Sequence, residues 1–336
     1  MRGLTGRLEG EAIIAIEDSV KVKGERACEV RVPASTSNLG AGFDCFGLAL
    51  KLYLTVRARV VPEARYEWRM RSSAGEQETE KPATNDDLIF RAMRYAAERE
   101  GLSLPPVRLA VHNAVPIGRG LGSSGAAIVA GISLCSALCE TEISHETALR
   151  YAFELEGHAD NVAAALYGGL VISCVKADGH VLTIKRRWPP SVKVIVVSPD
   201  VPLQTVKARS ALPLTVSRDD AVHNLQRAAL FGAAIEEGAY ELLWEAMRDR
   251  LHQVHRQSLV KGLADALATP QRPGLIGLAL SGSGPSIVAL ASDNFDEIGE
   301  AIATNFRLQE VEATVRLLEV DNEGIRIEGW NRRDRM

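Results

Sequence analysis

The most informative stretch of the chain reads Pro116-Ile117-Gly118-Arg119-Gly120-Leu121-Gly122-Ser123-Ser124, between a predicted strand at residues 107–111 and a predicted helix at residues 124–138. Glycines let the backbone approach an anion closely, and a helix start offers unpaired N–H groups and a positive dipole end. Ser123 and Ser124 add hydroxyl groups that can cap the helix. The stretch therefore predicts a phosphate-binding loop, with an ordinary turn and helix start as the alternative. It is not a Walker A loop, because no Gly-Lys-Ser or Gly-Lys-Thr follows.

Two further motifs carry candidate chemistry. One is Ser281-Gly282-Ser283-Gly284-Pro285-Ser286, which lies between two predicted strands and also suits a flexible hairpin loop. The other is Glu154-Leu155-Glu156-Gly157-His158-Ala159-Asp160-Asn161, where carboxylates gather beside an amide. Oxygen ligands of this kind suit Mg²⁺, although a solvated helix end capped by Gly157 is the alternative. We expect His158 to form hydrogen bonds rather than bind a metal, because the sequence has no partner histidine at suitable spacing.

Charged residues that suit a zwitterionic small molecule lie far apart in the sequence. Asn38 and Asp44 are early in the chain, and Arg209 and Arg256 are late. Arginine binds a carboxylate through its planar fork of N–H donors. Each of these residues alone also fits an ordinary surface position.

Composition limits the class of protein. The chain has 336 residues, of which 46% are hydrophobic and 24% charged, and this composition predicts a globular protein of one large or two ordinary domains. The net charge is −4, so the chain lacks the basic stripe of a protein that binds nucleic acids or membrane surfaces. No segment reaches the roughly 18–20 apolar residues of a membrane helix, and the N-terminus resembles neither a secretory signal nor a transit peptide. The five cysteines are scattered and odd in number, which fits a reducing compartment. We therefore expect a cytoplasmic protein.

Strand and helix patterns alternate without the even cadence of a doubly wound sheet, so the predicted class is α+β, with a domain break near residues 170–195. Residues 1–26 are expected to form an extension. Strands are expected at residues 28–32, 50–61, 107–111, 168–175, 193–198, 275–280, 287–291 and 311–319, with one more edge strand within residues 62–87. Helices are expected at residues 88–100, 124–138, 145–156, 219–236, 240–258 and 295–305.

These motifs, in this order, resemble the GHMP kinase superfamily over about residues 28–320. The loop Pro116–Ser124 is similar to its phosphate-binding motif, and Gly277-Leu-Ala-Leu-Ser-Gly-Ser-Gly-Pro-Ser286 is similar to its C-terminal motif. Within the superfamily, Val32-Pro-Ala-Ser-Thr-Ser-Asn-Leu-Gly-Ala-Gly-Phe-Asp44 and Glu156-Gly-His-Ala-Asp-Asn161 look like motifs of the homoserine kinases. The joint occurrence of these motifs in this order is much more specific than any one of them.

The resemblance implies a two-domain GHMP kinase fold. Residues 27–172 would form an ATP-binding domain like the second domain of ribosomal protein S5, with a left-handed βαβ crossover, and residues 173–330 a ferredoxin-like domain. It also implies that ATP, Mg²⁺ and L-homoserine meet between the domains. The side-chain hydroxyl would be phosphorylated to O-phospho-L-homoserine, a step of threonine biosynthesis.

The resemblance also implies roles for individual residues. Asn38 and Asp44 would hold the substrate ammonium, Arg209 and Arg256 its carboxylate, and Asn161 the reacting hydroxyl. Thr205 would also contact the substrate, and Asn161 and Arg209 would serve catalysis. Several relatives use an Asp or Lys as base, but Asn161 cannot accept a proton as a carboxylate can, so we expect no side-chain general base here. The nucleotide would be bound by Pro116, Ile117, Gly118, Arg119, Gly120, Leu121, Gly122, Ser123, Ser124, Gly125, Ala126 and Ser283. Mg²⁺ would be held by Ser124 and Glu156, with Glu154 as a rival ligand.

The sequence departs from the family pattern at a few positions. Gly125 replaces a usual alanine, and Val254 and His255 replace a usual proline and tyrosine just before Arg256. The stretch Glu156–Asn161 is shorter than in some members, which keeps Glu154 open as a ligand. The alternatives are a kinase of the same superfamily for mevalonate, shikimate or a sugar, or a catalytically silent nucleotide-binding regulator. A homodimer is compatible with the sequence.

Overall fold

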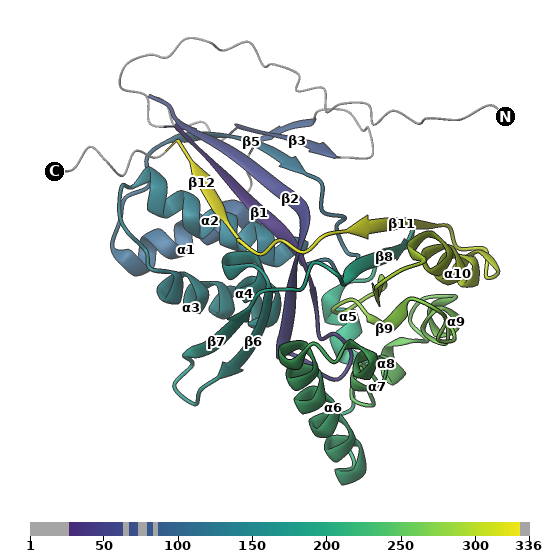
Figure 1. Ribbon diagram of the computed structural model, residues 1–336. Helices are drawn as coiled ribbons and strands as arrows, with labels where there is room; N and C mark the ends of the chain where they lie inside the picture. Colours follow the sequence, from purple (N-terminus) through teal and green to yellow (C-terminus); the bar gives the residue numbers. More distant parts are fainter. Residues whose placement is uncertain (1–26, 63–66, 73–78, 83–86, 330–336) are drawn as a thin grey trace.

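The computed structural model describes residues 27–62, 67–72, 79–82 and 87–329, and it contains two β-sheets with helices packed against them (Figure 1). The extension expected at residues 1–26 lies outside the described residues. The first sheet has eight strands, in the order β12-β1-β2-β5-β3-β4, with β6 paired to the start of β2 and β7 paired to β6. Its strands are β1 (Ala27–Ser37), β2 (Phe46–Val60), β3 (Glu67–Ser72), β4 (Thr79–Pro82), β5 (Val107–Asn113), β6 (Leu170–Val175), β7 (Val181–Arg186) and β12 (Arg326–Glu328).

Four helices pack against the first sheet: α1 (Leu88–Glu100), α2 (Ser123–Leu138), α3 (His145–Glu156) and α4 (Asp160–Tyr167) (Figure 1). Helix α2 is apolar on almost every side, so it is buried at the centre of this layer. Its Gly131 faces α1 so closely that a Cβ atom there would lie 2.3 Å from the carbonyl oxygen of Ile89. Strands β3 and β5 pair in parallel. Helix α1 lies between them in the sequence, so the three elements form a βαβ unit.

The second sheet is antiparallel, and its order β11-β8-β10-β9 is that of a ferredoxin-like domain. The predicted α+β class and the ferredoxin-like second part are therefore confirmed. The strands are β8 (Lys193–Pro199), β9 (Leu275–Leu280), β10 (Ile287–Ala291) and β11 (Ala313–Leu318). The helices are α5 (Thr205–Ser210), α6 (Arg218–Glu237), the 3₁₀ turn η1 (Tyr240–Leu242), α7 (Leu243–Ala246), α8 (Gln253–Arg256), α9 (Leu263–Leu267) and α10 (Phe295–Arg307).

The chain passes from the first sheet to the second between Arg186 and Lys193, and β12 returns to pair with β1 (Figure 1). The division expected after residue 172 falls inside β6, and it stays a prediction. No helix among the described residues combines the length and the apolar character that crossing a membrane requires.

The single helix expected at residues 240–258 is wrong. Three short elements replace it, separated by a turn between Ala246 and Gln253. The carboxylate of Asp249 accepts hydrogen bonds from the backbone N–H groups of Leu251, His252 and Gln253, and these bonds compete with continued helix. The single edge strand expected within residues 62–87 is in fact two strands, β3 and β4. The other predicted strands and helices are present with ends shifted by a few residues, whereas α4, α5, α9, β7 and β12 were not predicted.

Candidate active site

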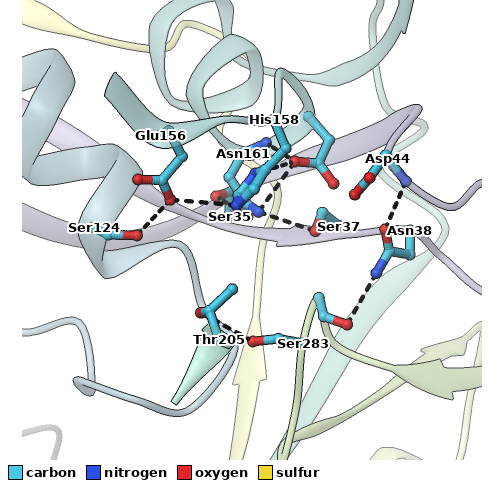
Figure 2. Close-up of polar contacts among 12 residues, drawn as sticks. Ser35, Ser37, Asn38, Asp44, Ser124, Glu156, His158, Asn161, Thr205 and Ser283 are labelled. Carbon is cyan, nitrogen blue, oxygen red and sulfur yellow. Dashed lines mark hydrogen bonds and ion pairs between the residues drawn. The ribbon is translucent and has the colours of Figure 1, made fainter. Parts of the chain in front are cut away.

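A cavity of about 390 Å³ lies where the two parts of the fold meet, and residues of both parts line it. It is lined by the phosphate loop, the starts of α2 and α4, the end of β1 with the loop after it, α5 and the loop after β9. Figure 2 shows several of the polar side chains of this cavity and the bonds among them.

The phosphate loop has the backbone that its glycines allow. Gly118, Gly120 and Gly122 have φ angles of 67°, 72° and 68°, in the left-handed region that favours glycine. A Cβ atom at Gly120 would lie 2.1 Å from the carbonyl oxygen of Ser281. The N-cap of α2 is Gly122, which makes no side-chain cap bond, so the expected capping by Ser123 or Ser124 is wrong. The first N–H groups of α2 are therefore left for an anion in the cavity.

The C-terminal glycine-serine loop binds directly to the phosphate loop and to β1. The hydroxyl of Ser281 is 2.9 Å from Thr36 Oγ1 and 2.6 Å from the carbonyl oxygen of Gly120. The backbone N–H of Gly282 donates to the carbonyl of Ser37 over 3.1 Å. Three motifs that are far apart in the sequence thus form one hydrogen-bonded unit.

Asn161 lies at the start of α4 and is held on both sides of its amide (Figure 2). Its Nδ2 donates to Ser37 Oγ over 3.0 Å and to Asp160 Oδ1 over 3.2 Å. Its Oδ1 accepts from Ser35 Oγ over 2.8 Å. A carboxylate oxygen only accepts hydrogen bonds, so Asp160 fixes which way the amide faces. Asn161 is therefore a rigid, uncharged group in the cavity wall.

His158 lies between two carboxylates, 3.0 Å from Asp160 Oδ1 and 3.7 Å from Glu156 Oε1. Burial disfavours the charged imidazolium, but the hydrogen bond and charge of Asp160 and the charge of Glu156 raise the pKa of His158 above its ordinary value. Burial likewise disfavours the charged carboxylate of Asp160, yet His158 and the N–H of Asn161 keep the pKa of Asp160 below its ordinary value. Asp160 is therefore ionised and a weak base.

Glu156 accepts a hydrogen bond from the hydroxyl of Ser124 at the start of α2 (Figure 2). Both side chains line the cavity beside the phosphate loop. Glu154 is elsewhere: it bonds to Tyr95 and Arg99 and does not line the cavity. A hydroxyl and a carboxylate next to a phosphate site are the donors that Mg²⁺ takes, so Ser124 and Glu156 fit this cation and Glu154 does not.

Asp44 and Arg209 form a bidentate ion pair, with contacts of 2.6 and 3.1 Å. Burial disfavours the guanidinium cation, but Asp44 raises the pKa of Arg209 above its ordinary value. Asn38 supports the pair, because its Oδ1 accepts from the N–H of Asp44 over 3.0 Å and its Nδ2 donates to the carbonyl of Gly282 over 2.9 Å. Asp44 and Arg209, which were predicted to bind the two opposite charges of the substrate, are thus paired with each other at one end of the cavity.

Arg256 lies deeper, with 1% of its surface exposed. Burial, with the charge of Arg209 nearby, lowers the pKa of Arg256 to about 10. Both guanidinium groups lie over the ring of Phe43. The Cζ atoms of Arg256 and Arg209 are 5.4 and 5.7 Å from the centroid of that ring. The cavity therefore has two cations and one carboxylate at this end.

Most of the predicted site residues line the cavity. Thr205 and Ser283 both line it and lie side by side, with 3.4 Å between their hydroxyl oxygens (Figure 2). Arg119 instead pairs with Asp200, and Gly125 and Ala126 pack inside α2, so these three do not line the cavity and their part in nucleotide binding stays a prediction.

Several cavity residues were not predicted as site residues. Ser37, Phe43, His158 and Asp160 line the cavity, and Ser35 bonds to Asn161 directly behind it. All five lie within motifs that the sequence already marked, so their place in those motifs was a usable signal. What the sequence did not contain was the pairing between motifs.

A glycine-rich loop at a free helix start, a carboxylate–hydroxyl pair beside it and cationic side chains from a ferredoxin-like part define a kinase of small molecules. A family model described as GHMP kinases N terminal domain matches residues 87–169, and one described as GHMP kinases C terminal matches residues 224–308.

Proteins of similar sequence and structure narrow this class of small-molecule kinases to one family. The chain is 39% identical to a homoserine kinase of Solibacter usitatus, over 83% of this chain and 90% of that protein. It is 42% identical to a homoserine kinase of Deinococcus radiodurans, over 78% of this chain and 84% of that protein. The crystal structure of a homoserine kinase from Cytophaga hutchinsonii matches with a TM-score of 0.77 and 26% identity, over 90% of this chain and 97% of that chain. The chain belongs to the homoserine kinase family of the GHMP kinases.

Proposed function

We propose that this protein transfers the γ-phosphate of Mg·ATP to the side-chain hydroxyl of L-homoserine and forms O-phospho-L-homoserine. The observation that carries the proposal is the Asp44–Arg209 ion pair, with Arg256 beside it, in a cavity that the phosphate loop also lines. A zwitterionic amino acid replaces that pair by two new ones, its ammonium with Asp44 and its carboxylate with Arg209 and Arg256. Mevalonate lacks an ammonium group, so it would leave Asp44 without a cation.

The nucleotide is bound by the phosphate loop. Backbone N–H groups of Gly120 to Ser124 and the positive end of α2 hold its phosphates. Ser124 and Glu156 would hold Mg²⁺, which would neutralise negative charge on the phosphates. Phosphoryl transfer depends mainly on such positioning and charge neutralisation.

The hydroxyl oxygen of homoserine attacks the γ-phosphorus in line, and the bond from that phosphorus to the oxygen of ADP breaks. Asn161 orients the hydroxyl, because its amide is fixed by Ser35, Ser37 and Asp160. We expect no side-chain general base: an amide cannot take the proton, and the depressed pKa of Asp160 makes that carboxylate a poor acceptor. The proton of the attacking hydroxyl passes instead to an oxygen of the transferred phosphoryl group.

The direct test is ADP release with Mg·ATP and L-homoserine, compared with mevalonate, shikimate, galactose and no acceptor. Selective turnover of homoserine supports the proposal. Turnover of another acceptor would overturn the roles of Asp44, Arg209 and Arg256, and ATP binding without turnover would indicate a silent regulator. Arg256→Lys should raise the homoserine KM far more than the ATP KM, because the bidentate contact is lost; equal losses would contradict the assignment.

We also propose that the protein works in the cytoplasm, where its five free cysteines would stay reduced. The homodimer that the sequence allows is a separate proposal, and sedimentation equilibrium of the purified protein tests it.

A further inference from the structure

A row of buried polar side chains lies behind the end of the cavity that contains Arg256. The side chains of Asp249 and His252 are both 0% exposed. Neither lines the cavity, and neither has a part in the reaction proposed above. Three buried ionisable groups in contact need a physical reason, because an unpaired buried charge strongly destabilises a fold.

The hydrogen bonds of His252 fix its protonation state. Nε2 is 3.0 Å from the carbonyl oxygen of Gly40, and Nδ1 is 3.2 Å from Nη1 of Arg256. A carbonyl only accepts and a guanidinium only donates, so Nε2 carries the hydrogen and Nδ1 is the acceptor. His252 is therefore a neutral imidazole whose free lone pair faces the arginine.

The charged groups around the ring favour this neutral form on balance. Burial is the main cause that lowers the pKa of His252, and the charge of Arg256 adds to it. The charges of Asp249 and Asp44 and the bond to Gly40 oppose the shift without reversing it.

Asp249 holds the turn that carries the histidine. Its Oδ2 accepts from the N–H groups of His252 and Gln253 over 3.0 and 2.8 Å, and its Oδ1 accepts from Asn224 Nδ2 over 2.7 Å. His252 and Arg256 are four residues apart across the short helix α8, so they lie on one face of it. The position of the imidazole is thus set before any ligand binds.

The guanidinium of Arg256 is held on two of its three nitrogens. Nε donates to the carbonyl of Ala208 over 3.2 Å, and Nη1 is bonded both to His252 and to the carbonyl of Gly282 over 3.2 Å. Within the described part of the chain, no acceptor is bonded to Nη2. Phe43 stacks on the imidazole at 5.2 Å and lies against the guanidinium, which restricts rotation of its plane.

We propose that His252 is a positioning residue: its Nδ1 lone pair holds Nη1 of Arg256, so that Nη2 is presented to the carboxylate of the substrate. This inference rests on the proposed function, because it takes the ligand of Arg256 to be the carboxylate of homoserine. The family motifs give Arg256 a part in binding, and the structure assigns the orientation of its side chain to His252.

Two substitutions separate this role from simple packing. His252→Asn places an amide oxygen near the position of Nδ1 and can still accept from Arg256, but it loses the donor to Gly40. His252→Gln places an amide nitrogen near the position of Nε2 and can still donate to Gly40, but it loses the acceptor at Nδ1. Both substitutions remove the ring that stacks on Phe43, so the loss of stacking is the same in the two variants.

We expect His252→Gln to raise the homoserine KM about 10-fold, the usual effect of losing one hydrogen bond to a charged group. We expect His252→Asn to stay within about threefold of the wild type, and both variants to keep the ATP KM within about twofold. Equal homoserine KM values for the two variants, or a larger rise for His252→Asn, would overturn the inference.

The wild type is assayed first, so that two failures stay distinct. No homoserine turnover by the wild type overturns the proposed function and this inference together, whereas normal wild-type turnover with indistinguishable variants overturns this inference alone. Two-bond ¹H–¹⁵N NMR spectra of the wild-type protein give a second reading that needs no variant. They should show the neutral ring with its hydrogen on Nε2; an imidazolium at neutral pH would refute the proposal.

Discussion

Replacing Gly122 with alanine tests how the phosphate loop is coupled to Asn161. At Gly122, where φ is 68°, a Cβ atom would lie 2.0 Å from Ser35 Oγ and 3.1 Å from Asn161 Oδ1. The Ser35 hydroxyl would have to turn away, and its 2.8 Å bond to Asn161 would be lost. The substitution at Gly122 therefore disturbs the position of Asn161, although Asn161 itself is unchanged.

The effect on stability can be estimated in two parts. A left-handed backbone costs an alanine about 1–2 kcal/mol relative to glycine. A buried amide oxygen left without its donor adds about 1–3 kcal/mol. We therefore expect Gly122→Ala to lower the free energy of unfolding by about 2–5 kcal/mol.

Gly101 provides the matched control. It ends α1 with a φ of 65°, and a Cβ atom there would meet nothing within 4 Å. Gly101→Ala should therefore show only the backbone term, about 1–2 kcal/mol. The difference between the two variants isolates the contact with Ser35.

The assay is urea unfolding of both variants, followed by turnover at saturating substrates. Gly101→Ala should turn over as fast as the wild type, and Gly122→Ala should be at least about 10-fold slower, because a misplaced Asn161 weakens orientation of the hydroxyl. Adding Ser35→Ala to Gly122→Ala should destabilise by less than the sum of the two single changes. Equal stability losses for Gly101→Ala and Gly122→Ala, with equal turnover, would refute the reasoning.

Three further predictions concern other parts of the site. Asn161→Ala should lower kcat about 10–100-fold with a smaller change in the homoserine KM, since orientation is lost and binding contacts remain; a normal rate would show that the amide has no such role. Glu156→Gln should raise the Mg²⁺ concentration for half-maximal rate about 10-fold, and Glu154→Gln should leave it unchanged; the reverse order, in Mg²⁺ titrations at fixed ATP, would make Glu154 the ligand. As the pH falls below about 6.5, the wild type should lose stability relative to His252→Asn, by at most about 1.4 kcal/mol per pH unit. The reason is that folding lowers the pKa of His252, so the unfolded chain takes up a proton at a higher pH than the folded protein does. Urea unfolding at pH 7.5 and 5.5 measures this difference, and parallel losses in both proteins would contradict it.

Local chemistry explains the parts of the fold that could be predicted from the sequence. Helix α1 begins at an Asp87 cap and ends at a left-handed Gly101, and both signals are visible in the chain. The strands of the second sheet are short apolar runs between turn residues, which is why their positions were predicted closely. Helix α4 was missed although it begins with Asp160 and continues through an alanine-rich run, because it is only eight residues long.

The turn between Ala246 and Gln253 could not be predicted in the same way. Residues 240–258 contain neither glycine nor proline, and their helical pattern is uninterrupted. The local bonds of Asp249 form only where distant groups hold the turn: Asn224 bonds to Asp249 and to the N–H of Arg250, and Gly40 accepts from His252. Tertiary hydrogen bonds overrode local propensity there, and local sequence does not contain them.

The candidate site shows the same division. The residue types and the motifs were predicted, but Asp44 and Arg209 were expected to bind opposite ends of a ligand rather than each other. They are 165 positions apart, and they meet only in the folded chain, where Arg209 of α5 bonds to Asp44 in the loop after β1. On the proposed function the ion pair would favour a zwitterion, because a ligand with a single charge would pair with one partner and leave the other without a counter-ion in a half-buried position.

The three glycine- and serine-rich motifs are informative together because they are hydrogen-bond partners. Ser281 bonds to Thr36 and to the carbonyl of Gly120, and Gly122 leaves just enough room for Ser35. A larger side chain in any one of these loops would displace a buried polar group of another and leave it unpaired. The motifs are therefore joined by contacts that only the folded chain shows, and those contacts gather the phosphate loop, Asn161 and the charged pair around one cavity.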